Sequence, residues 1–130
     1  MSTFIRGGRL VTEIDSYDAS VLVEDGLISR VGRGLEPPED AEVYDASGKL
    51  ILPGVVDAHV HVGLDLRGHT SSDYESTTRE AAFGGVTTFL TYAMPAKGET
   101  LMDAVEREMS RADSATYVDF GMHAGLVNWS

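Results

Sequence analysis

The sequence of 130 residues contains no cysteine and no long apolar run. The absence of cysteine excludes a disulfide framework and any metal site built on thiolates. No stretch approaches the roughly 18 apolar residues that a membrane-spanning helix needs, and the first residues lack the basic and apolar regions of a signal peptide. We therefore expect a cytoplasmic protein that does not engage a membrane.

Basic residues are also scarce. Lys and Arg number 10 against 21 Asp and Glu, which gives a formal net charge of −11. Such acidity repels nucleic acid and anionic lipid, so neither is an expected partner. The apolar fraction, in contrast, is an ordinary 42%, which is typical of a soluble globular protein.

Residues 1–52 predict short strands joined by tight turns. Asp25-Gly26 lies between two β-prone runs, which is a strong signal for a two-residue hairpin loop. Gly7-Gly8 predicts a further turn. We expect a small antiparallel sheet that is too short to bury much surface by itself.

The pattern changes at Pro53. Strands are predicted to begin at residues 55, 86 and 117, at a constant spacing of 31 residues, with a helix in each interval. Strands that alternate with helices at this period predict βαβ units and a parallel sheet. We therefore predict an α/β protein in which residues 53–130 form the first two and a half units of a (β/α)₈ TIM barrel. An open doubly wound sheet is the alternative, but no glycine-rich phosphate loop follows the first strand.

Two helix starts are predicted within this region. Ser72 and Glu75 have the spacing of a capping box, and Thr100 can cap a second helix. The buried stripe of that second helix is predicted to include Met109. Because a parallel sheet cut after its third strand leaves an unpaired edge, we also expect that the chain is truncated at residue 130 and that this piece alone is poorly folded.

The first predicted strand carries the chemistry. Asp57, His59 and His61 fall on one face because side chains alternate along a strand. The two imidazoles can converge on one divalent metal at the carboxyl end of the strand, where barrel active sites lie. A chance or structural His-x-His pair is the alternative. Asp57 is a candidate to orient one histidine by accepting its second N–H, or equally to cap a neighbouring strand or loop.

The 31-residue repeat links the second and third strands to this site. Tyr92 and His123 occupy the same position in their units as His61, so they are candidates to contact substrate or to support the metal ligands. Ordinary hydrogen bonding at the rim explains them equally well. Leu64 and Leu66, in the segment after the histidine pair, are further candidates for a substrate pocket, although a surface connection is an equal alternative.

Several stretches resemble the amidohydrolase superfamily, and within it the hydantoinase/dihydropyrimidinase family. They are residues 52–61, which contain the histidine pair, residues 70–74, residues 79–88 and residues 95–98. The resemblance covers essentially the whole chain. It implies that residues 1–52 are part of a small β-sandwich domain that precedes the barrel.

The resemblance also implies a function. Members hold two divalent metals, usually zinc, and His59 and His61 would bind one of them. The carboxylated lysine that bridges the metals, further histidines and a proton-shuttling aspartate are expected beyond residue 130, so this piece alone would be inactive. The reaction is ring opening of a hydantoin or dihydropyrimidine to an N-carbamoyl amino acid, usually by a homotetramer.

Two alternatives stay open beside this function. One is an allantoinase-like or other cyclic ureidohydrolase. The other is a non-catalytic dihydropyrimidinase-related protein that acts as a scaffold. A dihydroorotase is disfavoured, because that resemblance would place an arginine where this chain has Gly63.

Overall fold

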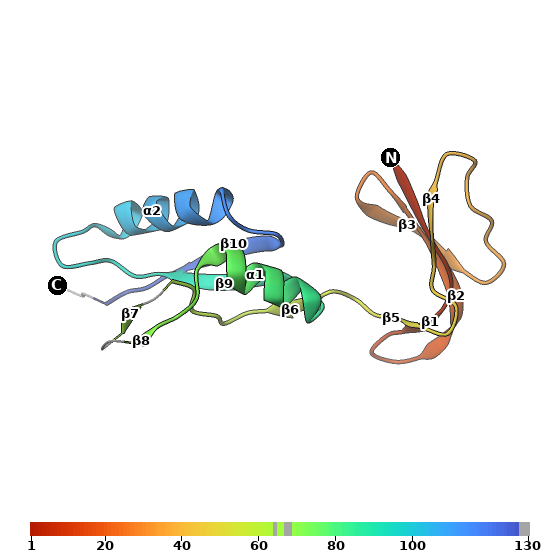
Figure 1. The fold of residues 1–130 in the computed structure, drawn as a ribbon, viewed down its shortest axis with the longest axis horizontal. Coiled ribbons are helices and arrows are strands. Elements are labelled where there is room, and N and C mark those ends of the chain that lie inside the picture. The colour runs from red at the N-terminus through yellow and green to blue at the C-terminus, as the bar shows by residue number, and fades with distance from the viewer. Residues whose placement is uncertain (64, 67–68, 128–130) are drawn as a thin grey trace. The chain divides into compact units, whose positions relative to one another are not determined.

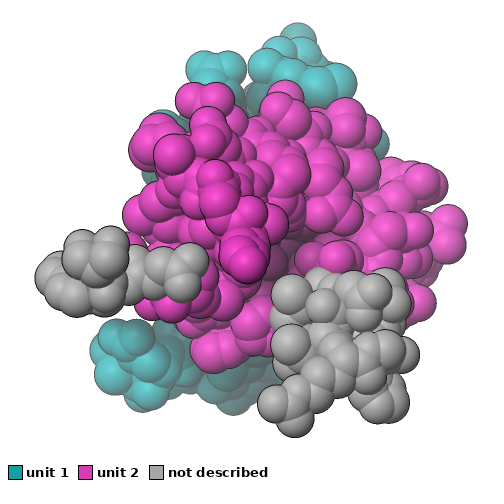
Figure 2. Space-filling view, turned by 90° about the vertical axis from the view of Figure 1, so that its left-hand side faces the viewer, with its two compact units in different colours: residues 1–53 teal, residues 54–130 magenta. Residues whose placement is uncertain are grey.

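The computed structural model describes residues 1–63, 65–66 and 69–127. The chain divides into two compact units, Met1–Pro53 and Gly54–Ser130, which are coloured separately in Figure 2. The change in sequence pattern at Pro53 therefore lies where the two units meet along the chain. Each unit has its own sheet, and each is described by itself.

The first unit is a five-stranded sheet with β1 at its centre. Its strands are β1 (Ser2–Val11), β2 (Ser16–Glu24), β3 (Leu27–Gly32), β4 (Glu42–Asp45) and β5 (Leu50–Ile51). The order is β3-β2-β1-β4, and β5 also pairs with β1. The predicted antiparallel sheet is wrong in one respect, since β4 and β5 run parallel to β1. The segment after β3 crosses back before β4 begins, as a parallel pairing requires.

One predicted turn of this sheet is confirmed and one is wrong. Asp25 and Gly26 both have positive φ, 50° and 78°, and join β2 to β3 as a two-residue hairpin. Gly7 and Gly8 instead lie inside β1, where the register with β2 shifts. Gly7 has φ +63°, so the pair forms a bulge within a continuous strand.

The second unit is built from βαβ units, as predicted. A three-stranded parallel sheet has the order β10-β9-β6, with β6 (Val55–Asp57), β9 (Val86–Ala93) and β10 (Asp119–Ala124). Helix α1 (Tyr74–Phe83) links β6 to β9, and α2 (Leu101–Asp113) links β9 to β10 (Figure 1). A short antiparallel pair, β7 (Asp65–Leu66) and β8 (His69–Thr70), precedes α1.

The two helices begin at polar caps. Thr100 caps α2 and forms a reciprocal capping box with Asp103, so this prediction is confirmed. The cap predicted at Ser72 is wrong by one residue. Asp73 caps α1, because its carboxylate accepts the backbone N–H of Ser76. The hydrogen bond from the Ser76 hydroxyl, followed by the one from the Ser76 backbone N–H, holds the pKa of the Asp73 carboxyl below its usual range.

The core of the second unit lies between the sheet and both helices. Along β9 the buried residues alternate, at Phe89, Thr91 and Ala93, with half-buried or exposed ones. Phe89 packs in one cluster with Tyr74 of α1 and Ala112 of α2. Both helices therefore cover the same face of the sheet. Within the described residues, no helix has the length and apolar character to cross a membrane.

Two strands are shorter than predicted. The first strand was expected to continue to residue 61, but β6 ends at Asp57, whose carboxylate accepts the backbone N–H of His59. The third was expected to begin at residue 117, but the N–H of Tyr117 donates to Thr78 of α1 instead of to the sheet, and β10 begins at Asp119.

Candidate metal-binding site

His59 and His61 lie just past the carboxyl end of β6 and are exposed. Their ring centroids are 5.3 Å apart, with the rings edge to face. The chain between them is still tied to the sheet, because the N–H of Val60 donates to the carbonyl of Leu90 at 3.1 Å. The two imidazoles are therefore presented side by side at the carboxyl edge of a parallel sheet.

Tyr92 of β9 contacts both histidines. Its hydroxyl is 3.2 Å from Nδ1 of His59, and its ring stacks on that of His61 with centroids 5.1 Å apart. A register shift explains this placement. Because Val55 pairs with Val86 but Asp57 pairs with Phe89, Tyr92 comes level with the residue between the two histidines.

The contact between Tyr92 and His59 suits a metal ligand. A neutral imidazole that donates Nδ1–H to the tyrosine oxygen keeps its lone pair on Nε2. That tautomer is the form that binds a metal through Nε2, and a hydrogen bond to the other ring nitrogen is the usual way to fix it. Tyr92 thus orients the ring of His59, and in the tautomer that donates Nδ1–H to the tyrosine oxygen the Nε2 lone pair is available to a metal.

His123 of β10 completes the group, which we call the histidine cluster (His59, His61, Tyr92 and His123). Its ring lies 4.9 Å from that of Tyr92, its direct partner in the sheet. Its Nε2–H donates to the carbonyl of Ala58 at 3.2 Å. The structure therefore brings four predicted site residues together, from three strands, at one edge of the sheet.

The donor set fits part of a metal site. Two exposed imidazole side chains suit zinc, manganese, iron or cobalt as divalent ions. Among the described residues, no group of three His, Cys, Asp or Glu side chains converges on one point. Asp57 is half-buried and accepts the main-chain N–H of His59 at 3.1 Å, so it shapes the turn that carries the histidine. The described residues therefore offer two imidazole donors, fewer than a complete metal site needs.

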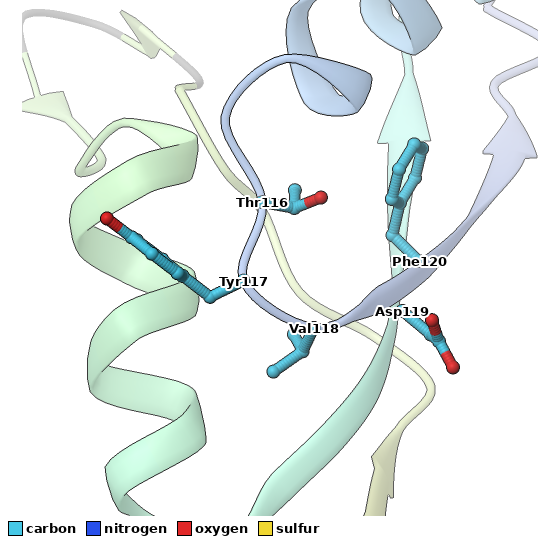
Figure 3. A pocket seen from close by; sticks show the side chains of 5 residues that line it. All are labelled: Thr116, Tyr117, Val118, Asp119 and Phe120. Atoms are coloured by element: carbon cyan, nitrogen blue, oxygen red, sulfur yellow. The ribbon is translucent and has the colours of Figure 1, made fainter. Parts of the chain in front are cut away.

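The two leucine candidates cannot be placed in the pocket. Leu64 lies outside the described residues, and the side chain of Leu66 does as well. A large open cavity of about 420 Å³ lies elsewhere, at the opposite end of β10, where residues 116–120 line it. Figure 3 shows the Tyr117 side chain reaching toward α1 there. That cavity holds none of the histidines, so it is not the candidate site.

A second polar group was not predicted from the sequence. We call it the carboxylate cluster (Tyr74, Arg107, Glu108 and Arg111). Glu108 is only 6% exposed, and it lies on the buried stripe of α2 where Met109, 43% exposed, was predicted. Glu108 receives hydrogen bonds from Arg107, from Arg111 and from the hydroxyl of Tyr74. Burial, together with the charge of Glu108, raises the pKa of Tyr74 to about 12.

The two clusters face a common cavity. It has a volume of about 130 Å³, and its lining includes His61 and Tyr92 of the first cluster and Arg107, Glu108 and Arg111 of the second. The spacing of Ala104, Glu108 and Ala112, four residues apart, was the signal that could have identified the buried carboxylate.

Comparison with known proteins shows which proteins the whole chain resembles. No protein-family model matches the chain. It is 40% identical to a dihydropyrimidinase of Rattus norvegicus, over 97% of the chain and 25% of that protein. It is 35% identical to the human dihydropyrimidinase-related protein 5, over 97% of the chain and 22% of that protein. A crystal structure of D-hydantoinase is 40% identical and superimposes with a TM-score of 0.87, over 95% of this chain and 27% of that one.

These proteins share the fold of the chain. Each match runs along nearly the whole chain, which spans about a quarter of the length of the relatives. The chain is therefore a homologue of the dihydropyrimidinases and D-hydantoinases, and it corresponds to their N-terminal segment. The resemblance inferred from the motifs is confirmed.

Proposed function

We propose that the full-length protein is a metal-dependent hydrolase that opens a hydantoin or dihydropyrimidine ring to an N-carbamoyl amino acid. The observation that carries the proposal is the histidine pair, which Tyr92 orients at the carboxyl edge of a parallel sheet. Relatives named dihydropyrimidinase and D-hydantoinase support the choice of substrate class.

The proposal extends to the architecture and the cofactor. The parallel order β10-β9-β6, with both helices on one face, is how a (β/α)₈ barrel begins, and residues 1–52 would belong to a small flanking β-sandwich. We propose two zinc ions per complete site, with His59 and His61 holding one of them. A cytoplasmic homotetramer completes the proposal.

The residues of this chain would have separate tasks. His59 and His61 would hold the metal, which lowers the pKa of a bound water and polarises the ring carbonyl when it is present. Tyr92 would hold the ring of His59 through its hydroxyl, and its own ring packs against His61. His123 ties β10 to the carbonyl of Ala58, which fixes the main chain one residue before the first ligand.

Metal content and ring opening test the proposal together. The full-length protein is expected to retain about two zinc ions per subunit and to hydrolyse dihydrouracil or hydantoin. His59→Ala is expected to lose both properties. Retained zinc with turnover of allantoin alone would instead favour the ureidohydrolase alternative.

The similarity to dihydropyrimidinase-related protein 5 supports a second candidate, a non-catalytic scaffold. The retained histidine pair favours the enzyme, since a scaffold has no need for metal ligands. A full-length protein without bound metal, and without turnover of any of the three substrates when zinc is supplied, would establish the scaffold and overturn the enzyme.

A further inference from the structure

Among the residues of the second unit whose burial the structure describes, Glu108 is the charged side chain that is buried, with 6% exposure. Arg111 donates through Nη1 to both carboxylate oxygens at 3.0 Å, and the Tyr74 hydroxyl donates to Oε2 at 3.1 Å. The guanidinium of Arg111 also lies over the Tyr74 ring, 5.7 Å from its centroid. Burying a carboxylate in this way costs desolvation energy that an apolar side chain would not, so stability alone does not account for it.

Arg111 reaches the chain immediately after the histidine pair. Gly63 has φ +63°, and a Cβ placed on it would lie 2.7 Å from Nη2 of Arg111. The guanidinium therefore fills the space beside a residue two positions beyond His61. Only glycine satisfies both the left-handed backbone and this close approach without a shift of Arg111.

The other partner of Glu108 fixes the far end of the same segment. Tyr74 is 3% exposed and begins α1, directly after the cap Asp73. The carbonyl of Ser72 accepts the N–H of Gly63 at 2.8 Å, which closes the base of the segment. One buried carboxylate thus binds both Arg111, which lies beside Gly63, and Tyr74, which begins α1.

We propose that Glu108 is a positioning residue for the metal site, a role that rests on the proposed function. By holding Arg111 against Gly63 and Tyr74 at the start of α1, it fixes where the main chain leaves His61. That direction decides whether the second imidazole stays stacked on Tyr92 and beside His59. The cavity shared by His61, Tyr92 and Glu108 places the two clusters next to each other.

Glu108→Gln in the full-length protein tests the proposal, because it removes the charge and keeps the shape. We expect zinc affinity to fall by about 10-fold, as for other groups that orient metal ligands. We also expect faster hydrogen exchange at the Gly63 amide in the metal-free protein, with a melting temperature close to that of the parent. Glu106→Gln removes the same charge from the exposed side of α2 and is expected to change neither zinc affinity nor Gly63 exchange.

Arg111→Lys gives a second route if Glu108→Gln folds poorly. It keeps the positive charge but loses the two-oxygen contact with Glu108, so Gly63 exchange is expected to rise and zinc affinity to fall. Unchanged zinc affinity and unchanged Gly63 exchange in a folded variant would overturn the proposal. If the parent binds no zinc, the proposed function fails, and unchanged Gly63 exchange in the variants would separately refute the role of Glu108 at Gly63.

Discussion

The histidine cluster and the carboxylate cluster both contribute to the lining of one small cavity, yet they are stabilised in opposite ways. His59 and His61 are exposed and contact neutral aromatic rings. Glu108 is buried and receives hydrogen bonds from two cationic side chains. A neutral imidazole can remain near water with a free lone pair, whereas a buried charge must be paired.

This difference separates a group that is available to a ligand from a group that is already satisfied. An exposed histidine nitrogen without a protein partner costs little free energy, because water can bind it, so it stays available to a ligand. The carboxylate of Glu108 has its hydrogen-bonding capacity occupied by Arg107, Arg111 and Tyr74. Substitutions in the first cluster should therefore act by removing or misorienting a metal ligand, whereas truncation of Glu108 in the second should also lower folding stability.

His61→Ala is expected to give the largest effect. Loss of a metal ligand removes several kcal/mol of transition-state stabilisation, so ring-opening activity should fall by at least about 100-fold. The melting temperature should hardly change, because the residue is exposed. Zinc analysis and steady-state kinetics on the full-length protein measure both. Lys97→Ala, at an exposed position after β9, is the matched control and should retain full zinc content.

Glu108→Ala is expected to lower folding stability, which His61→Ala should leave nearly unchanged. It leaves the Tyr74 hydroxyl and two guanidinium groups without their shared acceptor. The arginine side chains are 40% and 45% exposed, so water can replace part of the lost contact. We therefore expect the free energy of unfolding to fall by about 2 kcal/mol, which is less than for a fully buried pair. Urea unfolding measures it. A loss no greater than that of Glu106→Ala would mean that the cluster contributes nothing to stability.

The sequence predicted the first cluster better than the second for a physical reason. The 31-residue repeat brings Tyr92 and His123 into direct register in the parallel sheet. Register and strand alternation follow from local geometry, so residues far apart in the chain could be aligned in advance. The shift between Val55 and Val56 was not visible, and it is this shift that sets Tyr92 between the two histidines.

Burial of a charge depends on partners that local patterns do not reveal. Helix α2 was assigned a stripe containing Met109 because apolar residues are usually buried. The actual stripe contains Glu108, since Arg107, Arg111 and Tyr74 offset the cost of enclosing it. The cap of α1 was also misplaced, because either Ser72 or Asp73 could accept a hydrogen bond. The cap is the residue directly before the first turn, and α1 begins at Tyr74.

Tyr92→Phe sharpens the comparison within the histidine cluster. The substitution keeps the ring that stacks on His61 and removes the hydroxyl that contacts Nδ1 of His59. Zinc affinity is expected to fall by about 10-fold, because His59 loses the hydrogen bond that orients its ring. Tyr117→Phe removes a hydroxyl that lies 3.5 Å from Glu75, far from the site, and should leave zinc affinity unchanged. Equal affinities in the two variants would show that the ring alone orients the histidines.

Glu99→Gln is expected to give the smallest effect, and it tests the outer edge of the carboxylate cluster. Arg107 donates to Glu99 as well as to Glu108, and this bond, followed by the N–H of Ala96, lowers the pKa of Glu99 from 4.5 to about 2. A carboxyl with a lowered folded-state pKa contributes stability above pH 4.5 and loses it as the pH falls toward 2. The melting temperature of the parent should therefore fall as the pH is lowered over that interval.

In Glu99→Gln the melting temperature should fall less steeply with decreasing pH over the same interval. Some pH dependence should remain, because the pKa values of Asp73 and Asp45 are also lowered. Glu106→Gln should keep the parent slope. If Glu99→Gln and the parent lose stability in parallel, the Arg107–Glu99 contact does not survive in solution. Arg107 would then serve Glu108 alone, and the carboxylate cluster would end at the helix rather than extend into the connection between β9 and α2.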